Sequence, residues 1–211
     1  MGLLDRVHGG YVYQRRVNVL AEHLANAIPE ESQVLDIGCG DGLIDSLICE
    51  RRKDVRIEGI DVMLRSRTMI PVTEFDGVRV PHPDGSFDVV QFVDVLHHTP
   101  DPSVLLREGR RVARRGVVIK DHLRDGLLSG PILSFMDWVG NARHGVVLPY
   151  NYWPKRRWQE AFSTIGLTVD RWNEQLDLYP VYANWLFGRG LHFVAYLRCD
   201  ARAGQDTEGG H

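Results

Sequence analysis

The feature that most constrains the fold is a short apolar strand followed at once by alternating glycines. Residues 33–37 form a β-type run, and Gly38, Gly40 and Gly42 come directly after it. Glycines at such a turn let the backbone bend tightly and approach a ligand, because no Cβ stands in the way. A helix predicted over residues 43–52 follows, and the first turn of a helix offers unpaired N–H groups. The pattern predicts a strand–turn–helix unit with a ligand at the turn.

Helices and strands alternate on both sides of this unit. Apolar residues at helical spacing predict a helix over residues 11–27, which Pro29 ends. The remaining patterns predict strands over 55–62, 72–75, 87–96, 116–119, 167–172 and 191–198, and helices over 101–115 and 154–165. Such alternation indicates βαβ units around a parallel sheet. We expect one domain over residues 1–202, with an insert at about 122–153 and a disordered tail over 203–211.

Composition narrows the class of protein. With 44% hydrophobic and 25% charged residues, the 211-residue chain has enough apolar material for a core. A net charge of -3 gives no general attraction to nucleic acid or to anionic membranes. Three cysteines, Cys39, Cys49 and Cys199, have no metal-ligand spacing, so neither a disulfide framework nor a metal site is expected. The chain shows no signal peptide and no apolar run long enough to cross a membrane, so a cytoplasmic location is expected.

Three acidic residues follow successive predicted strands. Asp36 lies two residues before the first glycine, where a carboxylate would repel a pyrophosphate but attract a cationic amino group. Asp61 ends the second strand, a position from which a carboxylate accepts hydrogen bonds from a ribose diol. Asp76 follows the third strand and could accept from an exocyclic amine such as that of adenine. Together these acids predict a nucleoside ligand that carries no phosphate, which disfavours a nicotinamide oxidoreductase.

Five motifs in this order carry a family resemblance. They read VLDIGCGDG at 34–42, GIDV at 59–62, FDG at 75–77, VPHPDGSFD at 80–88 and LHHTP at 96–100. Over residues 33–119 the chain resembles the class I S-adenosylmethionine-dependent methyltransferases, and most closely their small-molecule "type 11" branch. The resemblance implies an α/β, Rossmann-like fold. Its doubly wound sheet has seven strands, mostly parallel with an antiparallel last strand, and an aromatic-rich cap insert.

The resemblance also implies a role for individual residues in binding S-adenosylmethionine. The glycine turn would pass under the methionine part, Asp61 would hold the ribose, and the residues after Asp61 and at Asp76 would hold the adenine. Asp36 would orient the turn and the amino group, and Arg15 on the N-terminal helix could pair with the cofactor carboxylate. The full set of implied cofactor-binding residues is Asp36, Gly38, Cys39, Gly40, Asp61, Val62, Met63, Asp76, Gly77 and Arg15.

The catalytic candidate is His122, which follows the fifth predicted strand at the ligand edge of the sheet. Methyl transfer needs a base only when the acceptor starts protonated, as a phenol does. A neutral histidine whose tautomer is fixed by the neighbouring Asp121 could serve as that base. The alternative is a hydrogen-bonded loop histidine. The pair His97 and His98 is common in the resembled family and mostly structural.

Aromatic residues concentrate after residue 134, where all five tryptophans lie. We assign Trp158, Phe162 and Phe193 to the core. The insert over residues 122–153 is long for a compact domain and falls where the resembled family places its acceptor-binding cap. The residues expected to line an apolar acceptor pocket are Trp138, Tyr150, Tyr152 and Trp153.

These patterns favour an enzyme that transfers a methyl group to a small, apolar or aromatic acceptor, such as a lipid, a quinone or a secondary metabolite. One alternative is a non-catalytic cofactor-binding or partner-binding protein on the same fold. Another is an RNA methyltransferase, motivated by five arginines that would share one face of the helix predicted over 101–115. The net charge argues against it, as does the run Asp94-Val95-Leu96-His97 in place of an Asn/Asp-Pro-Pro-aromatic motif. The five arginines are Arg107, Arg110, Arg111, Arg114 and Arg115.

Overall fold

The structure is a computed structural model, and it describes residues 3–125, 151–179 and 190–200. The strands are β1 Gln33–Ile37, β2 Arg56–Asp61, β3 Val72–Glu74, β4 Phe87–Val93, β5 Ala113–His122, β6 Leu167–Asn173 and β7 His192–Cys199. The helices are α1 Leu3–Ala27, α2 Leu43–Arg51, α3 Pro102–Val112 and α5 Lys155–Thr164, with a short 3₁₀ helix, η1, at Leu96–His98. All the elements described below belong to these ranges.

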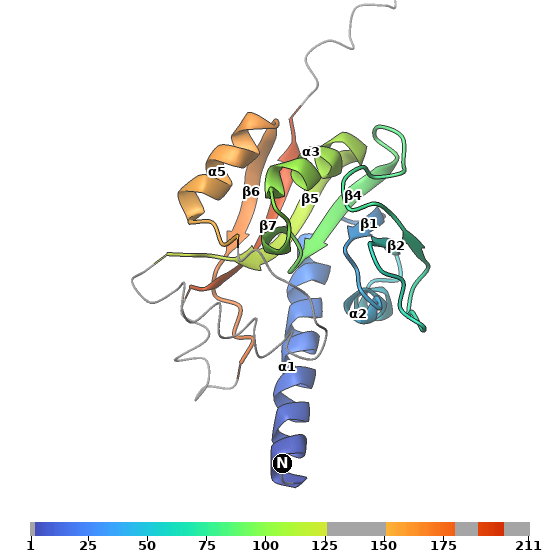
Figure 1. The fold of residues 1–211 in the computed structure, drawn as a ribbon, viewed down its shortest axis with the longest axis vertical. Helices are drawn as coiled ribbons and strands as arrows, with labels where there is room; N and C mark the ends of the chain where they lie inside the picture. The colour runs from blue at the N-terminus through green and yellow to red at the C-terminus, as the bar shows by residue number, and fades with distance from the viewer. Residues whose placement is uncertain (1–2, 126–150, 180–189, 201–211) are drawn as a thin grey trace, which may run out of the picture.

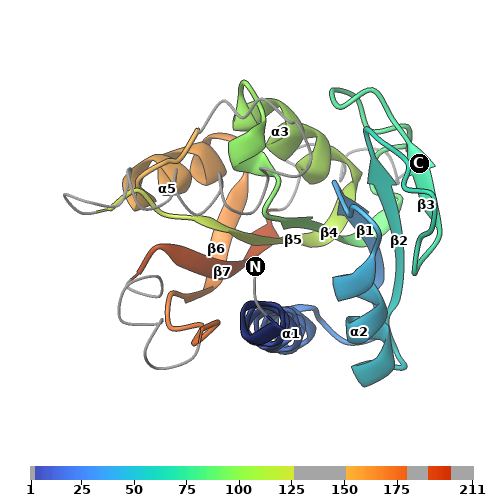
Figure 2. The ribbon, with the colours of Figure 1, turned by 60° about the horizontal axis from the view of Figure 1, so that its bottom comes forward.

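The strands form one seven-stranded sheet in the order β3-β2-β1-β4-β5-β7-β6. Neighbouring strands from β3 to β5 pair in parallel, whereas β7 runs antiparallel to both β5 and β6. Helices α1 and α2 cover one face of the sheet, and α3 and α5 cover the other (Figure 2). This three-layer arrangement with an antiparallel last strand confirms the fold class that the sequence predicts.

Two apolar layers hold the sheet between its helices. On the α3 and α5 side the buried cluster contains Trp158, Phe162 and Phe193, which confirms their assignment to the core. On the other side Leu20 and Leu24 of α1 are buried against the sheet. Because the central strands β1, β4 and β5 are covered on both faces, most of their side chains are buried whichever face they point to.

Several predicted boundaries were wrong: the helix predicted over 11–27 begins at Leu3, and the strand predicted over 116–119 spans Ala113–His122. The helix predicted to reach Arg115 ends at Val112, because Ala113 pairs with Phe87 of β4 and starts β5. Pairing with β4 on one side and with β7 on the other outweighs local helix propensity in this segment. The strand predicted to reach Leu96 ends at Val93, because Asp94 adopts a left-handed conformation with φ of 55° and turns the chain.

The arginines predicted to share one helix face do not do so, since Arg114 and Arg115 belong to β5. Arg111 donates to Glu108 and Asp84 and to backbone oxygens of the loop before β4. Arg114 donates to Asp88, and Arg115 donates to the backbone oxygen of Glu30. Arg111 ties the loop before β4 to α3, Arg114 joins β5 to β4, and Arg115 joins β5 to the loop after α1. The basic surface that motivated an RNA substrate is therefore not present as predicted.

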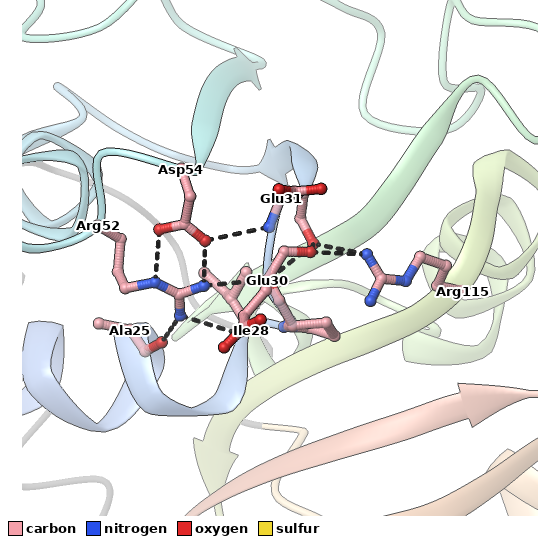
Figure 3. Close-up of polar contacts among 9 residues, drawn as sticks. Ala25, Ile28, Glu30, Glu31, Arg52, Asp54 and Arg115 are labelled. Carbon is pink, nitrogen blue, oxygen red and sulfur yellow. Dashed lines mark hydrogen bonds and ion pairs between the residues drawn. The ribbon is translucent and has the colours of Figure 1, made fainter.

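The C-terminal end of α1 is fixed by Arg52 (Figure 3). Its Nη1 atom donates to the backbone oxygens of Ala25 at 2.6 Å and Ile28 at 3.0 Å. Asp54 holds the same guanidinium in a fork, accepting from Nε at 2.9 Å and from Nη2 at 2.7 Å. Because the last carbonyls of a helix have no partner inside the helix, Arg52 satisfies groups that would otherwise face the protein interior without a donor. The contact sets where α1 lies on the sheet.

Replacing Arg52 with alanine is expected to lower the free energy of unfolding by about 2 kcal/mol, because charged hydrogen bonds to two helix carbonyls are lost. For a chain of this size that loss corresponds to a melting temperature lower by roughly 4–8 °C. Thermal or urea unfolding followed by circular dichroism measures the change. Arg56→Ala, at an exposed position at the start of β2, is the matched control. Equal losses in the two variants would contradict the anchoring role of Arg52.

Candidate functional site

The candidate site lies at the carboxyl ends of β1 and β4. The chain leaves β1 toward β2 on one side and returns to β4 on the other, and ligands of open α/β sheets bind at this kind of switch point. A cavity of about 180 Å³ lies there. Its walls come from α1, from the turn after β1, from α2 and from the end of β4. The lining residues are Tyr13, Arg16, Val17, Leu20, Asp36, Gly38, Cys39, Asp41, Leu43, Ile44, Asp45, Val93 and Asp94.

The glycine turn after β1 has the backbone that its sequence predicts. Gly38, Gly40 and Gly42 have φ angles of 82°, 62° and 73°, in the left-handed region that favours glycine. The N–H of Gly38 donates to the backbone oxygen of Ile60 at 2.7 Å, which joins the turn to β2. A Cβ at Gly38 would lie 2.5 Å from a methyl carbon of Val95, whereas a Cβ at Gly40 would meet nothing within 4 Å. The turn therefore packs closely at Gly38 and stays open at Gly40.

Asp61 lies at the end of β2 and holds two loops at once. One carboxylate oxygen accepts from the N–H of Gly40 at 2.9 Å, and the other accepts from the N–H of Met63 at 2.9 Å. Each oxygen keeps a second lone pair, so the group can still accept from a ligand hydroxyl. The side chains of Val62 and Met63 beside it are 58% and 46% exposed. A carboxylate that can accept hydrogen bonds, next to exposed apolar side chains, fits a sugar diol that is joined to a flat base.

The turn at Asp76 lies beside this loop. The Asp76 carboxylate accepts from the N–H groups of Val78 and Arg79, both at 2.8 Å. These hydrogen bonds lower the pKa of Asp76, so it is ionised at neutral pH. A Cβ at Gly77 would lie 2.9 Å from a methyl carbon of Val62. The structure thus brings Asp76 and Gly77 next to the loop after Asp61, as expected for a shared binding surface.

Arg16, not Arg15, is the arginine that lines the cavity. Arg15 donates to the backbone oxygen of Asp177 at 3.3 Å, away from the glycine turn. Arg16 donates to the Asp94 carboxylate at 2.8 Å. Arg16 lies one helical turn before the buried Leu20, which also lines the cavity, so the two share one face of α1. Arg15 is not among the residues that line this cavity, and its pairing with a cofactor carboxylate stays a prediction.

The floor of the cavity is acidic and buried. Asp36 at the end of β1 is 2% exposed, and Asp45 on α2 is 1% exposed. Gln91 of β4 donates through Nε2 to Asp36 at 3.2 Å and to Asp45 at 3.0 Å. Burial, together with the neighbouring Asp45, raises the pKa of Asp36 well above its usual range, and burial raises the pKa of Asp45 to about 6. A cavity floor whose two acids are ionised, or share one proton, fits a cationic group of a ligand.

A group of interacting charged side chains lies at the C-terminal ends of β4 and β5. Lys120, which is fully buried, forms an ion pair with Asp94, and Arg16 pairs with the same carboxylate. Burial alone would raise the pKa of Asp94, but Lys120 and Arg16 hold it well below its usual range. Atoms of Asp94, His97 and His122 lie within 4.8 Å of one another. With two cations already on Asp94, these side chains do not fit a divalent metal ion in this arrangement.

His122, at the end of β5, contacts this group of charged side chains. Its ring is 4.5 Å from that of His97, measured between centroids, and its Nδ1 is 3.5 Å from a carboxylate oxygen of Asp121. His97 itself binds Asp121 through Nδ1 at 2.7 Å. Burial, then Lys120 and His97, lower the pKa of His122 well below 6.5, so the ring is neutral at pH 7. The histidine is buried, with 3% of its surface exposed.

The four residues predicted to line an acceptor pocket separate into three groups. Trp138 and Tyr150 lie outside the described residues. Tyr152 stacks on His97, with ring centroids 5.5 Å apart, and its ring centroid is 5.7 Å from that of His122. Trp153 packs on Trp158 in the main core and is 2% exposed. Its indole belongs to the buried core, and its assignment to a pocket wall stays a prediction.

Sequence reasoning missed Asp45, Gln91, Asp94 and Lys120 as site residues. Gln91 and Lys120 stand inside the apolar runs of β4 and β5, where both faces of the sheet are covered. A polar side chain in such a run has to find a partner in the interior. That signal could have indicated both residues, although not which acids they would meet.

Comparisons with known proteins agree with this geometry. A family model described as a methyltransferase domain matches residues 8–171. The chain is 31% identical over 169 residues to a 2-methyl-6-phytyl-1,4-hydroquinone methyltransferase of Synechocystis, covering 75% of this chain and 44% of that protein. It is 29% identical over 133 residues to a 27-O-demethylrifamycin SV methyltransferase of Amycolatopsis mediterranei, covering 53% and 48%. The chain thus spans about half the length of these curated relatives.

Solved structures share the fold. A S-adenosylmethionine-dependent methyltransferase from Mesorhizobium loti superimposes with a TM-score of 0.60 at 17% identity, covering 84% of this chain and 96% of that one. The PH0226 protein from Pyrococcus horikoshii gives a TM-score of 0.64 at 15% identity, covering 89% and 91%. Within the described residues, no helix is long and apolar enough to cross a membrane.

Replacing Gly38 with alanine is expected to destabilise the turn more than the same change at Gly40. Both variants place a Cβ on left-handed backbone, at a cost of about 1 kcal/mol each, but only Gly38→Ala also collides with Val95. Such overpacking adds roughly 1–3 kcal/mol. Urea unfolding of the two variants gives the difference. Equal losses would show that the close contact between the turn and Val95 does not exist in solution.

Proposed function

The chain belongs to the methyltransferase domain family, and from that premise we propose that it is a S-adenosylmethionine-dependent methyltransferase that acts on a small, apolar or aromatic acceptor. The observation that carries the proposal is the glycine turn held by Asp61 beside a cavity with an acidic floor. The site suits a nucleoside joined to a cationic amino acid. The turn leaves open space at Gly40, Asp61 can accept from a diol, and Asp36 and Asp45 are buried acids that suit the cationic group.

Each part of the proposed cofactor has residues that fit it. The glycine turn lets the backbone approach the methionine part, and Asp61 accepts hydrogen bonds from the ribose. Val62 and Met63 offer exposed apolar surface to the adenine, with the turn at Asp76 beside them. Arg16 offers a guanidinium in the cavity to the carboxylate, in place of the expected Arg15. Bound S-adenosylmethionine supplies a methyl group on a sulfonium, which is a good leaving group.

The protein's part in the reaction is to align the acceptor with that methyl group and to keep water out. The acceptor class is proposed from two supports. The names of two relatives give a hydroquinone and a rifamycin as substrates, and Tyr152 places an aromatic ring against His97 and His122 at the ligand edge. The two names describe compounds that carry hydroxyl groups, and the ring of Tyr152 favours an acceptor that is apolar or aromatic.

His122 is the residue proposed to take the proton of such a hydroxyl. Its ring is neutral at pH 7, so it can accept a proton. Burial and Lys120 disfavour the imidazolium that results, and Asp121 beside the ring offsets part of that effect. Burial by itself raises the pKa of Asp121, but His97 and the hydrogen bond with His122 keep it well below its usual range. Asp121 therefore stays a carboxylate whether or not His122 is protonated.

Asp61→Asn is expected to weaken S-adenosylmethionine binding about 10–100-fold, because hydrogen bonds to a charged group contribute about 1.5–3 kcal/mol. Isothermal titration calorimetry measures the affinity, and a melting curve shows that the variant folds. Glu58→Gln, at an exposed position of the same strand, is the matched control and should bind as the wild type does. If the wild type binds no S-adenosylmethionine, the proposal fails and a non-catalytic, partner-binding role is favoured.

His122→Gln is expected to lower turnover by roughly 10²–10⁴-fold on a hydroquinone acceptor while leaving cofactor affinity within about twofold, since general bases contribute this much to rate. A methyl-transfer assay with a short-chain alkylhydroquinone, run at several pH values, measures the loss. His82→Gln, whose ring packs on Phe87 away from the cavity, is the control. Turnover of His122→Gln within threefold of wild type would contradict the base assignment.

A further inference from the structure

The two buried acids of the cavity floor come from different elements and share one donor. Asp36 lies on β1 and Asp45 on α2, and the Nε2 atom of Gln91 donates to both. An amide nitrogen has two hydrogens, so Gln91 has no third to give. Asp36 Oδ1 and Asp45 Oδ2, both buried, accept no hydrogen bond from the described residues. Two oxygens without donors in the interior carry a large desolvation cost if both groups are ionised.

One proton between the two carboxyl groups removes this cost. It gives one group an O–H that the other can accept, and it leaves one negative charge where there would be two. Burial and the charge of Asp45 raise the pKa of Asp36 well above its usual range, which agrees with a retained proton at pH 7. The pair then titrates as one unit, and the proton belongs to both groups.

The charged groups around the pair strengthen this preference. Asp61 at the end of β2 and Asp41 in the glycine turn are negative, and they raise the pKa of Asp36 and of Asp45 respectively. The thiol of Cys39 remains protonated, because burial and Asp36 raise its pKa. From α1 and β4, Arg16 and Asp94 line the same cavity as an ion pair. Apart from that pair, the cavity floor holds excess negative charge and favours a cation.

We propose that Asp36 and Asp45 hold one proton in the free protein and release it when the amino group of S-adenosylmethionine binds at the cavity floor. The inference rests on the proposed function, because the ligand is the cofactor of that function. The O–H bond of the acid pair breaks, the proton passes to the buffer, and the N–H groups of the ammonium donate to the two oxygens. Asp45, outside every motif of the family resemblance, becomes a cofactor-binding residue.

The sign of the pH effect follows from proton counting. The free protein holds one proton more than the complex, so the apparent affinity rises with pH by up to tenfold per pH unit while about one proton is released. The rise flattens at the pH where the free pair is already ionised. A ligand with the nucleoside but without the amino group leaves the proton in place, and its affinity does not follow this rise.

Calorimetry in two buffers of different ionisation enthalpy tests the inference, with phosphate and Tris at the same pH near 7. For S-adenosylmethionine the observed enthalpy should differ between the buffers by an amount that corresponds to about one proton released. For methylthioadenosine, which lacks the amino acid part, the two enthalpies should agree. Binding of S-adenosylmethionine without any buffer dependence would overturn this inference alone, whereas no binding of either ligand would contradict the proposed function.

Asp45→Asn identifies the residue responsible. The asparagine amide donates a hydrogen bond to Asp36 and removes the like charge, so Asp36 is ionised before the ligand arrives. The variant should release no proton on binding and lose the rise in affinity between pH 6 and 7. Glu50→Gln, at an exposed position on the same helix, should behave as the wild type does. Proton release by Asp45→Asn equal to that of wild type would overturn the inference, and the wild-type buffer comparison remains decisive if the variant does not fold.

Discussion

The carboxylate of Asp61 is the contact on which the candidate site depends. It joins the end of β2 to the glycine turn through Gly40 and to its own loop through Met63. The parallel register of β1 with β2 brings these groups to one edge, since Ile37 lies beside Ile60 and both strands end there. Together with the hydrogen bond from the N–H of Gly38 to the backbone oxygen of Ile60, this contact holds the left-handed turn over the end of β2. The turn forms part of the cavity wall and leads into α2.

Buried charge is the second constraint on the site. Both faces of the sheet are covered by helices, so polar side chains at the ends of β1, β4 and β5 lie in a medium of low dielectric constant. There each group needs a partner of opposite charge or a shared proton. Lys120 and Asp94 meet the need as an ion pair, His97 and Asp121 as a hydrogen-bonded pair, and Asp36 and Asp45 as two acids with one donor. The same burial makes the ionisation of each group depend on its neighbours.

The sequence predicted what local patterns determine. The glycine turn, the acids at strand ends and the alternation of helix with strand follow from backbone requirements and hydrophobic periodicity, and they predicted a parallel α/β sheet correctly. The seven strands and the antiparallel last strand were implied by the family resemblance, and the structure confirms them. Contacts between distant segments could not be read in this way. The pairing of Ala113 with β4, the burial of Trp153 and the meeting of Asp45 with Asp36 all depend on tertiary packing. Trp138 and Tyr150 lie outside the described residues, so their roles stay predictions.

The position of Arg16, rather than Arg15, in the cavity wall shows how packing selects which of two adjacent arginines faces the candidate site. The phase of α1 is set by the burial of Val17, Leu20 and Leu24 against the sheet, and successive residues of a helix point about 100° apart. Arg16, which lies four residues before Leu20, therefore lines the cavity, whereas Arg15 does not. Arg52 holds the far end of the same helix. Since one cavity then contains both Arg16 and the acids of its floor, it carries complementary charges for a zwitterion such as an amino acid.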